Sequence, residues 1–433
     1  MANRLGVDPQ VLALAVARMT ESVGNSFLIV VLPLFIGSEL VSGATFGLTE
    51  VAITGIVLSL FGLVNSPLQP FTGRLSDRAG RRKVFVLVGL VLIGVASFAY
   101  SLASAYWHLV GLRVLQGVAG ALIIPTTVAL VNDLASDGNR GGNMGTYNTF
   151  RLVGFGVGPV AAGVVISAGP YAVAVGGETT FVVNGFHAAF YVATVTASLS
   201  FALVALLVRD PDVPEAEAGE ALFDGFSVRD RSGRGVLDPV FTLGLASFFM
   251  AVGIALFATL GDIVNERLAQ DATMFGLQFA AFILAQIPLQ APIGRATDFY
   301  GRKQFIVLGM ALLVPTTLAQ GIVLDSWLML GARFAQGVAG AMVFAPALAL
   351  AGDLAPAGRS GGTLSVLTMA FGFGVALGPL ASGFLVAFGF VVPFAFGAAL
   401  AVVGLALVQT QVEETVTDRR SLLEPFTKLL GGG

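Results

Sequence analysis

Two short polar segments interrupt an otherwise apolar chain, and they read Gly73-Arg74-Leu75-Ser76-Asp77-Arg78-Ala79-Gly80-Arg81-Arg82-Lys83 and Gly294-Arg295-Ala296-Thr297-Asp298-Phe299-Tyr300-Gly301-Arg302-Lys303. In both, an aspartate follows the first glycine by four positions, and a second glycine precedes a pair of basic residues. The second segment lies half a chain length beyond the first. A polar turn repeated in this way predicts that the chain consists of two related halves.

Long apolar runs surround these two segments. The 433 residues are 56% hydrophobic and 11% charged, with a mean hydropathy of +0.87, whereas soluble domains carry about 25% charged residues. A chain in lipid must satisfy its own backbone hydrogen bonds, so runs of about 20 apolar residues predict membrane-spanning helices. We expect spans near 11–36, 48–71, 84–104, 107–131, 143–168, 183–208, 240–262, 272–293, 304–324, 327–352, 362–388 and 391–411.

Basic residues are distributed unequally between the two sides of these spans. Of the 23 basic residues, 18 fall on one side, four lie within spans, and only Arg267 falls on the other side. Cytoplasmic loops carry the excess of lysine and arginine in membrane proteins. We therefore expect a multi-pass protein of the plasma membrane, surrounded by lipid, with both termini in the cytoplasm.

The predicted architecture is an all-α polytopic membrane protein with twelve transmembrane helices in two pseudo-symmetric six-helix bundles. We expect an N-terminal bundle at 1–208, a cytoplasmic linker at 209–239, a C-terminal bundle at 240–411 and a cytoplasmic tail at 412–433. The linker is polar, with two prolines and a run of acids, which is typical of a solvated tether.

A second repeated motif supports the duplication. The pattern R-x-x-Q-G occurs at Arg113 and again at Arg333, and the same spacing relates Asp133 to Asp353 and Pro159 to Pro379. Duplicated transporter folds place their substrate site at the interface of the repeats, near the middle of the bilayer.

The composition also argues against several classes of chemistry. The chain has no cysteine, two histidines and three lysines, and no lysine lies in a nucleotide-binding G-x-x-x-x-G-K-[ST] pattern. Neither G-x-S-x-G nor H-E-x-x-H occurs. We therefore expect no metal site, no cofactor, no enzymatic activity and no nucleic-acid partner, and ATP is not the expected energy source.

Both polar segments resemble the G-x-x-x-D-x-x-G-R-[RK] signature of the major facilitator superfamily. The resemblance implies a monomeric transporter of small molecules, in which these turns latch the halves when the cytoplasmic side is closed. The aspartates would cap helices 11 and 5, and the implied ion pairs are Arg81 with Asp133 and Arg302 with Asp353. The implied latch residues are Gly73, Asp77, Gly80, Arg81, Asp133, Gly294, Asp298, Gly301, Arg302 and Asp353. The alternative is that the basic residues only set the topology.

Helices 4 and 5 point to one branch of that family. Helix 5 carries Gly145, Gly154, Gly158, Pro159 and Gly163, which resembles the antiporter signature of drug:proton antiporters, the multidrug efflux branch. Ala162 replaces one glycine of that signature, and helix 11 repeats much of the pattern, so packing between helices remains an alternative.

The arginine of R-x-x-Q-G is associated with proton coupling in this branch, which implies that role for Arg113. The alternative is an arginine bonded to backbone carbonyls, and this is the role that we expect for Arg333.

Glu21 is the only carboxylate that we place deep in a span. At about 1.5 Å per residue, Arg18, Arg151 and Glu21 lie about 10, 12 and 15 Å from the cytoplasmic ends of their spans. We predict proton coupling by Glu21 and Arg113, and a substrate cavity lined by Arg18, Arg151, Gln286 and Gln290. Glu21 could instead form a fixed pair with Arg18, one helical turn away.

The expected function is proton-coupled efflux, by antiport, of small organic or lipophilic compounds. Three arginines within the spans of the N-terminal half against one deep acid favour an alternative, the transport of an organic anion or carboxylate. An alternative from another class is a membrane receptor or scaffold that transports nothing.

Overall fold

The computed structural model describes residues 8–134, 140–175, 178–210, 227–229, 235–354 and 360–416. Within these residues, twelve helices are long and apolar enough to span a membrane. The N half contains α2 (Pro9–Ile36), α3 (Glu50–Ala79), α4 (Arg82–Ala99), α5 (Tyr106–Leu134), α6 (Arg140–Ala168) and α7 (Gly185–Leu207). The C half contains α8 (Pro239–Ala255), α10 (Ala272–Tyr300), α11 (Arg302–Ile322), α12 (Ser326–Leu354), α13 (Ser360–Leu385) and α14 (Val391–Gln411).

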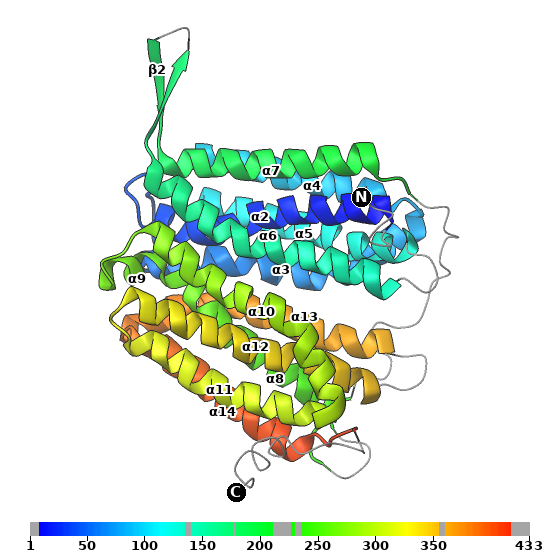
Figure 1. Ribbon diagram of the computed structural model, residues 1–433. Coiled ribbons are helices and arrows are strands. Elements are labelled where there is room, and N and C mark those ends of the chain that lie inside the picture. Colours follow the sequence, from blue (N-terminus) through cyan, green and yellow to red (C-terminus); the bar gives the residue numbers. More distant parts are fainter. Residues whose placement is uncertain are drawn as a thin grey trace, which may run out of the picture.

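The prediction of an all-α protein with two pseudo-symmetric bundles is confirmed. Helices of each half pack mainly on one another, and the halves meet where α6 contacts α10 and where α3 contacts α13. Figure 1 shows the N half above the C half, with the long helices running across the view. Spans 2, 5 and 8 are longer than we expected, because their helices continue past the apolar run into the polar residues that follow or precede it.

The seventh span is not one continuous α-helix. It consists of α8, a 3-10 segment η2 (Leu256–Leu260) and a short helix α9 (Gly261–Arg267). Two further 3-10 turns, η1 (Tyr100–Leu102) and η3 (Val386–Phe388), end the third and eleventh spans.

Helices α2 and α8 begin in the same way. Asp8 accepts a hydrogen bond from the backbone N–H of Gln10, and Asp238 accepts from the N–H groups of Val240 and Phe241. Each aspartate is followed by a proline at the first helical position, where the missing N–H has no cost.

The connection between α6 and α7 was not predicted. It forms a β-hairpin of β1 (Tyr171–Val175) and β2 (Glu178–Val183), which pair antiparallel. Figure 1 shows this hairpin extending away from the helices. We call this side of the molecule the hairpin face, and we call the opposite side, where α2 begins and α14 ends, the terminal face.

The two halves are closed against each other toward the hairpin face. Gly276 lies near the start of α10, and a Cβ there would overlap the carbonyl oxygen of Pro159; Gly55 of α3 meets the carbonyl of Pro379 in the same way. These carbonyls lie at equivalent positions of the repeat, so the halves approach through two matching contacts.

In each half, a carboxylate that follows the last helix accepts hydrogen bonds from the start of the third helix, which is α4 in the N half and α11 in the C half. After α7, the carboxylate of Asp210 accepts from the backbone N–H of Lys83 at 2.7 Å. After α14, Glu414 accepts from the N–H groups of Arg302 and Lys303 at 3.1 and 2.9 Å. Carboxylates at helix N-termini stabilise the unpaired N–H groups and the helix dipole there.

Candidate functional site

A buried ion pair lies near the middle of the N half. The guanidinium of Arg18 donates to the carboxylate of Glu21 at 2.6 Å, and the two residues are 7% and 4% exposed. At about 1.5 Å per residue, Glu21 lies about 18 Å from the start of α2, near the middle of a hydrocarbon core of about 30 Å. Removing one member of such a pair would leave an uncompensated charge, so the two side chains depend on each other.

Helix α6 adds two residues to this pair. Tyr147 is 3% exposed and lies within electrostatic range of Arg18, Glu21 and Arg151. Arg151 is half-buried; its Nε donates to the exposed amide of Asn148 at 2.9 Å, and its guanidinium lies 6.0 Å from the ring of Phe155. We call Arg18, Glu21, Tyr147 and Arg151 the charged cluster.

The structure thus brings together three of the residues predicted for proton coupling and substrate contact. Arg151 is the most accessible of them, and Arg18 and Glu21 lie more deeply buried beside Tyr147. Tyr147 was missed because a neutral side chain gave no charge signal, although it precedes Arg151 by four residues and therefore shares its helix face.

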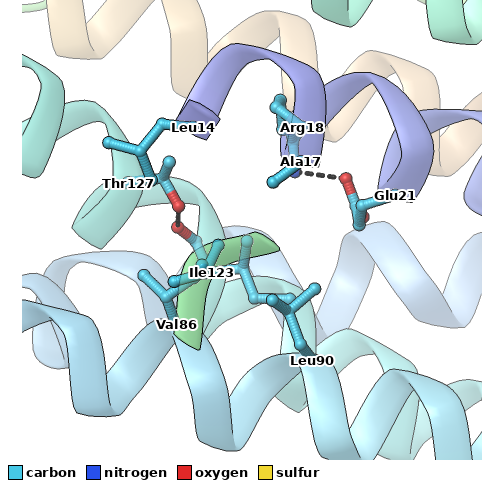
Figure 2. A pocket seen from close by; sticks show the side chains of 9 residues that line it. Leu14, Ala17, Arg18, Glu21, Val86, Leu90, Ile123 and Thr127 are labelled. Carbon is cyan, nitrogen blue, oxygen red and sulfur yellow. Dashed lines mark hydrogen bonds and ion pairs between the residues drawn. The ribbon is translucent and has the colours of Figure 1, made fainter. Parts of the chain in front are cut away.

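A small pocket adjoins the Arg18–Glu21 pair inside the N half, and Figure 2 shows the side chains around it. It is large enough for about one water molecule. Its lining comes from α2, α4, α5 and α7 and consists of Leu14, Ala17, Arg18, Glu21, Val86, Leu90, Ile123, Thr127 and Val204. The Thr127 hydroxyl donates to the carbonyl of Ile123, so polar groups are present on two sides of this otherwise apolar pocket.

Arg113 is buried in neutral surroundings. Its guanidinium donates to Gln116 at 3.0 Å and lies 5.0 Å from the ring of Phe61, and Tyr100 donates to the same Gln116 oxygen. Within the described part of the chain, no carboxylate pairs with Arg113, and its Nε has no hydrogen-bond partner. Its predicted role in proton coupling therefore stays a prediction.

Arg333 occupies the equivalent place in the C half. It donates to Gln336 and to the backbone carbonyls of Ile254 and Gln278, as we expected for a structural arginine. Three phenylalanine rings, those of Phe257, Phe279 and Phe282, lie 4.6, 5.6 and 5.1 Å from its guanidinium. Cation–π contacts and backbone bonds thus replace a counter-charge.

The first predicted latch pair needs a correction. Asp133 pairs with Arg82, at 2.8 Å, and Arg81 is exposed. The reason is a turn of different length in the two halves. Helix α3 ends before Gly80 and α4 begins at Arg82, whereas α11 begins at Arg302, directly after Gly301. The first residue of the helix forms the ion pair in both halves, and in the N half that residue is Arg82.

The second latch pair is formed as predicted. Arg302 contacts Asp353, and Asp353 also accepts from the hydroxyl of Thr415 at 2.7 Å. The side chain of Asp298 is 59% exposed and contacts Arg302 at 3.2 Å. Among the described residues, Asp298 does not contact the start of the fifth span (α6), where we predicted that it would cap the helix. The side chain of Asp77 lies outside the described residues.

Two glycines at the polar turns have positive φ angles. Gly80 has a φ of 58° and Gly301 a φ of 98°, conformations that other residues rarely adopt. Gly73 and Gly294 have room for a side chain: a Cβ at Gly73 would lie 3.7 Å from the Cβ of Pro125, and one at Gly294 would meet nothing within 4 Å. The latch between the two halves stays a prediction.

The motif glycines of the fifth span, which is α6, contact two neighbouring helices. A Cβ at Gly154 would overlap the carbonyl of Met19, and one at Gly158 would overlap the hydroxyl of Ser26, both on α2. A Cβ at Gly163 would meet Ala272 of α10, across the two halves. Gly145 has nothing within 4 Å. This part of the motif therefore serves close helix packing, and its role in antiport stays a prediction.

The two glutamines predicted for the cavity are both half-buried on α10. Gln286 donates to the backbone carbonyl of Phe282, one turn earlier. Gln278, which precedes them on the same helix, exchanges hydrogen bonds with Gln270 and is fully buried, so it belongs to the packing of the C half.

Comparisons with known proteins agree with these features. The tetracycline resistance protein, class C, of Escherichia coli is 27% identical over 261 residues, which cover 59% of this chain and 61% of that protein. An uncharacterized MFS-type transporter of Methanocaldococcus jannaschii is 28% identical over 181 residues, covering 42% of this chain and 47% of the relative. Multidrug resistance protein 2 of Bacillus subtilis is 25% identical over 191 residues, covering 44% and 48%. The chain thus matches about half of the length of these relatives.

Solved structures show the same fold over nearly the whole chain. A bacterial homolog to the human lysosomal transporter Spinster, in an inward-facing and occupied conformation, superposes with a TM-score of 0.72 at 14% identity, covering 96% of this chain and 99% of that one. The nucleoside transporter NupG gives a TM-score of 0.72 at 12% identity, covering 92% and 99%. The profile of the Major Facilitator Superfamily matches residues 14–260 and 241–430, and the chain therefore belongs to that superfamily.

Proposed function

We propose that the protein is a secondary active transporter that couples the export of small organic compounds to proton movement by alternating access. The observation that carries this proposal is the buried Arg18–Glu21 pair, at 2.6 Å, beside the half-buried Arg151. Charged side chains at this depth are costly in the membrane, and they commonly mark substrate or proton pathways. Relatives named as tetracycline and multidrug resistance proteins support an efflux role.

Glu21 is the proposed proton carrier. When substrate or a change of conformation draws Arg18 away, the carboxylate loses its counter-charge and takes up a proton; when the pair re-forms, the proton leaves. The groups that face Glu21 are Arg18 on its own helix and Tyr147 and Arg151 on α6. Water in the adjoining pocket would give the carboxylate a route for that proton.

Alternating access requires that the halves separate on one face while they meet on the other. The contacts of Gly276 with Pro159 and of Gly55 with Pro379 close the hairpin face. In the opposite state these contacts open, and the polar turns of the terminal face would latch. We propose that both termini are cytoplasmic, that the protein acts in the plasma membrane as a monomer, and that the terminal face is the cytoplasmic one.

One observation favours a second candidate, the transport of an organic anion. The charged cluster holds two arginines and one carboxylate, and the contacts of Arg151 are with a neutral amide and a phenyl ring. With Glu21 protonated the excess of positive charge grows, so an anion should bind more tightly as the pH falls.

Reconstitution into liposomes with an imposed pH gradient tests the proposal. A panel of cationic dyes and small carboxylates should reveal at least one compound whose uptake depends on the gradient. In the Glu21→Gln variant that dependence should disappear while the compound still binds. Unchanged pH dependence in Glu21→Gln would remove Glu21 from the mechanism, and absence of movement for every compound would favour the receptor or scaffold alternative.

A further inference from the structure

The two halves allow a position-by-position comparison of the central helices. Gly154 on α6 touches the carbonyl of Met19 on α2, and Gly374 on α13 touches the carbonyl of Phe248 on α8. These matching contacts align α6 with α13 and α2 with α8, and the alignment then continues residue by residue along each helix. Equivalent positions lie at the same depth on opposite sides of the pseudo-twofold axis.

The charged cluster has no counterpart in the C half. Arg18, Glu21, Tyr147 and Arg151 correspond to Ser247, Met250, Leu367 and Phe371. In the described spans of the C half, Arg333 is the one charged residue that is buried. Its guanidinium is enclosed by phenylalanine rings and is fully buried. The duplicated fold therefore presents charge on one side of its axis and none at the equivalent positions on the other.

The residue that corresponds to Arg151 in the C half is aromatic. The rings of Phe371 and Phe344 lie 4.6 Å apart, tilted, and join α13 to α12. Both residues are half-buried. Arg151 and Phe371 each follow the first residue of their helix by 11 positions, which places both about 17 Å along their helices at about 1.5 Å per residue.

We propose that the substrate is an amphipathic organic anion, with one acidic group held by Arg151 and an aromatic or apolar body packed on Phe344 and Phe371. A planar guanidinium binds a carboxylate through paired, charge-assisted hydrogen bonds. The two rings offer an apolar surface with no charge to repel or attract the rest of the molecule. Arg18 becomes a second ligand of the acidic group when Glu21 is released. This inference rests on the proposed transport function and names its substrate class.

Direct binding to the purified protein tests the inference without any gradient. The probes are 2-naphthoate, its uncharged amide 2-naphthamide, and acetate, which has the charge without the aromatic body. We expect 2-naphthoate to bind at least about tenfold more tightly than either of the others. Equal affinity for naphthoate and naphthamide, or absence of naphthoate binding, overturns the proposal.

Two variants separate the two contacts. Arg151→Gln should weaken naphthoate at least about tenfold and leave naphthamide unchanged, whereas Phe371→Ala should weaken both probes and keep their ratio. Arg267→Gln and Phe384→Ala are matched controls, since Arg267 and Phe384 are exposed residues outside the cluster. Equal effects of Arg151→Gln and Arg267→Gln contradict the inference. Wild-type discrimination between the two probes decides the matter even if a variant fails to fold.

The binding test also separates this inference from the proposed function. A protein that moves some other compound with protons but does not bind naphthoate overturns the substrate class alone. A protein that binds naphthoate with the expected selectivity but moves no compound under a pH gradient overturns the proton coupling alone.

Discussion

Replacing Gly276 by alanine should shift the protein toward a state that is open on its hairpin face. The added methyl group would overlap the backbone carbonyl of Pro159 on the other half, and neither atom can rotate away as a long side chain would. Overpacking of this kind costs about 1–3 kcal/mol. The cost applies only to the state in which α6 and α10 touch, so the ratio of the two states should change about 5- to 150-fold.

Distances between spin labels on the two halves would measure that shift. The chain contains no cysteine, so labels can be placed at Leu102→Cys and Leu324→Cys, two positions on the hairpin face that are each 70% exposed. Gly276→Ala should increase the population with the longer distance. Gly331→Ala lies on α12, outside the predicted latch, where a Cβ meets nothing within 4 Å, and serves as the control. Identical distance distributions in the two variants would refute the reasoning.

Three further predictions concern the ion pairs, the buried arginine and the topology. Arg82→Ala should lower the melting temperature by a few degrees and impair transport, whereas Arg81→Ala should change the free energy of unfolding by less than about 0.5 kcal/mol, because Arg82 forms the ion pair and Arg81 is exposed. Arg333→Met should keep or raise the melting temperature, since a buried cation without a counter-charge is replaced by an apolar side chain of similar size; a drop of more than about 10 °C would assign Arg333 an indispensable role. Ser227→Cys should react with impermeant thiol reagents only from the cytoplasm, and labelling from outside sealed cells would reverse the proposed orientation.

Sequence patterns predicted the spans well because the length and apolar composition of a transmembrane helix are set by the bilayer itself. The ion pairs at the polar turns were harder to predict. Aligned on Gly80 and Gly301, the two signatures suggest that Arg81 corresponds to Arg302, but the helix starts one residue later in the N half. Which basic residue reaches the acid depends on that start, and no residue type in the turn reports it.

The hairpin of β1 and β2 was missed for another reason. Its β-branched residues flank two glycines, a pattern that predicts a turn between strands. The segment is short and lies between two strong apolar runs, so it was predicted only as a connection between spans.

In the candidate site, the helical depth of each residue was enough to group Arg18, Glu21 and Arg151. The different surroundings of Arg113 and Arg333 were not predicted, because both residues occur in the same R-x-x-Q-G pattern. Their surroundings come from other helices: one ring, Phe61, faces Arg113, whereas three rings and two backbone carbonyls face Arg333. Such contacts depend on the arrangement of helices, which the motif does not encode.

The bonds from Asp210 and Glu414 back to the third helix of each half bear on how the protein is made. Once residue 210 has left the ribosome, the N half contains every group needed to cap its own third helix, and nothing from the C half is required for that step. The C half reaches the same point only at Glu414, close to the end of the chain. We therefore expect the first six helices to assemble in the membrane while the second six are still being synthesised. Fragments separated within 211–226 and produced together should still find each other through the faces of α3, α6, α10 and α13.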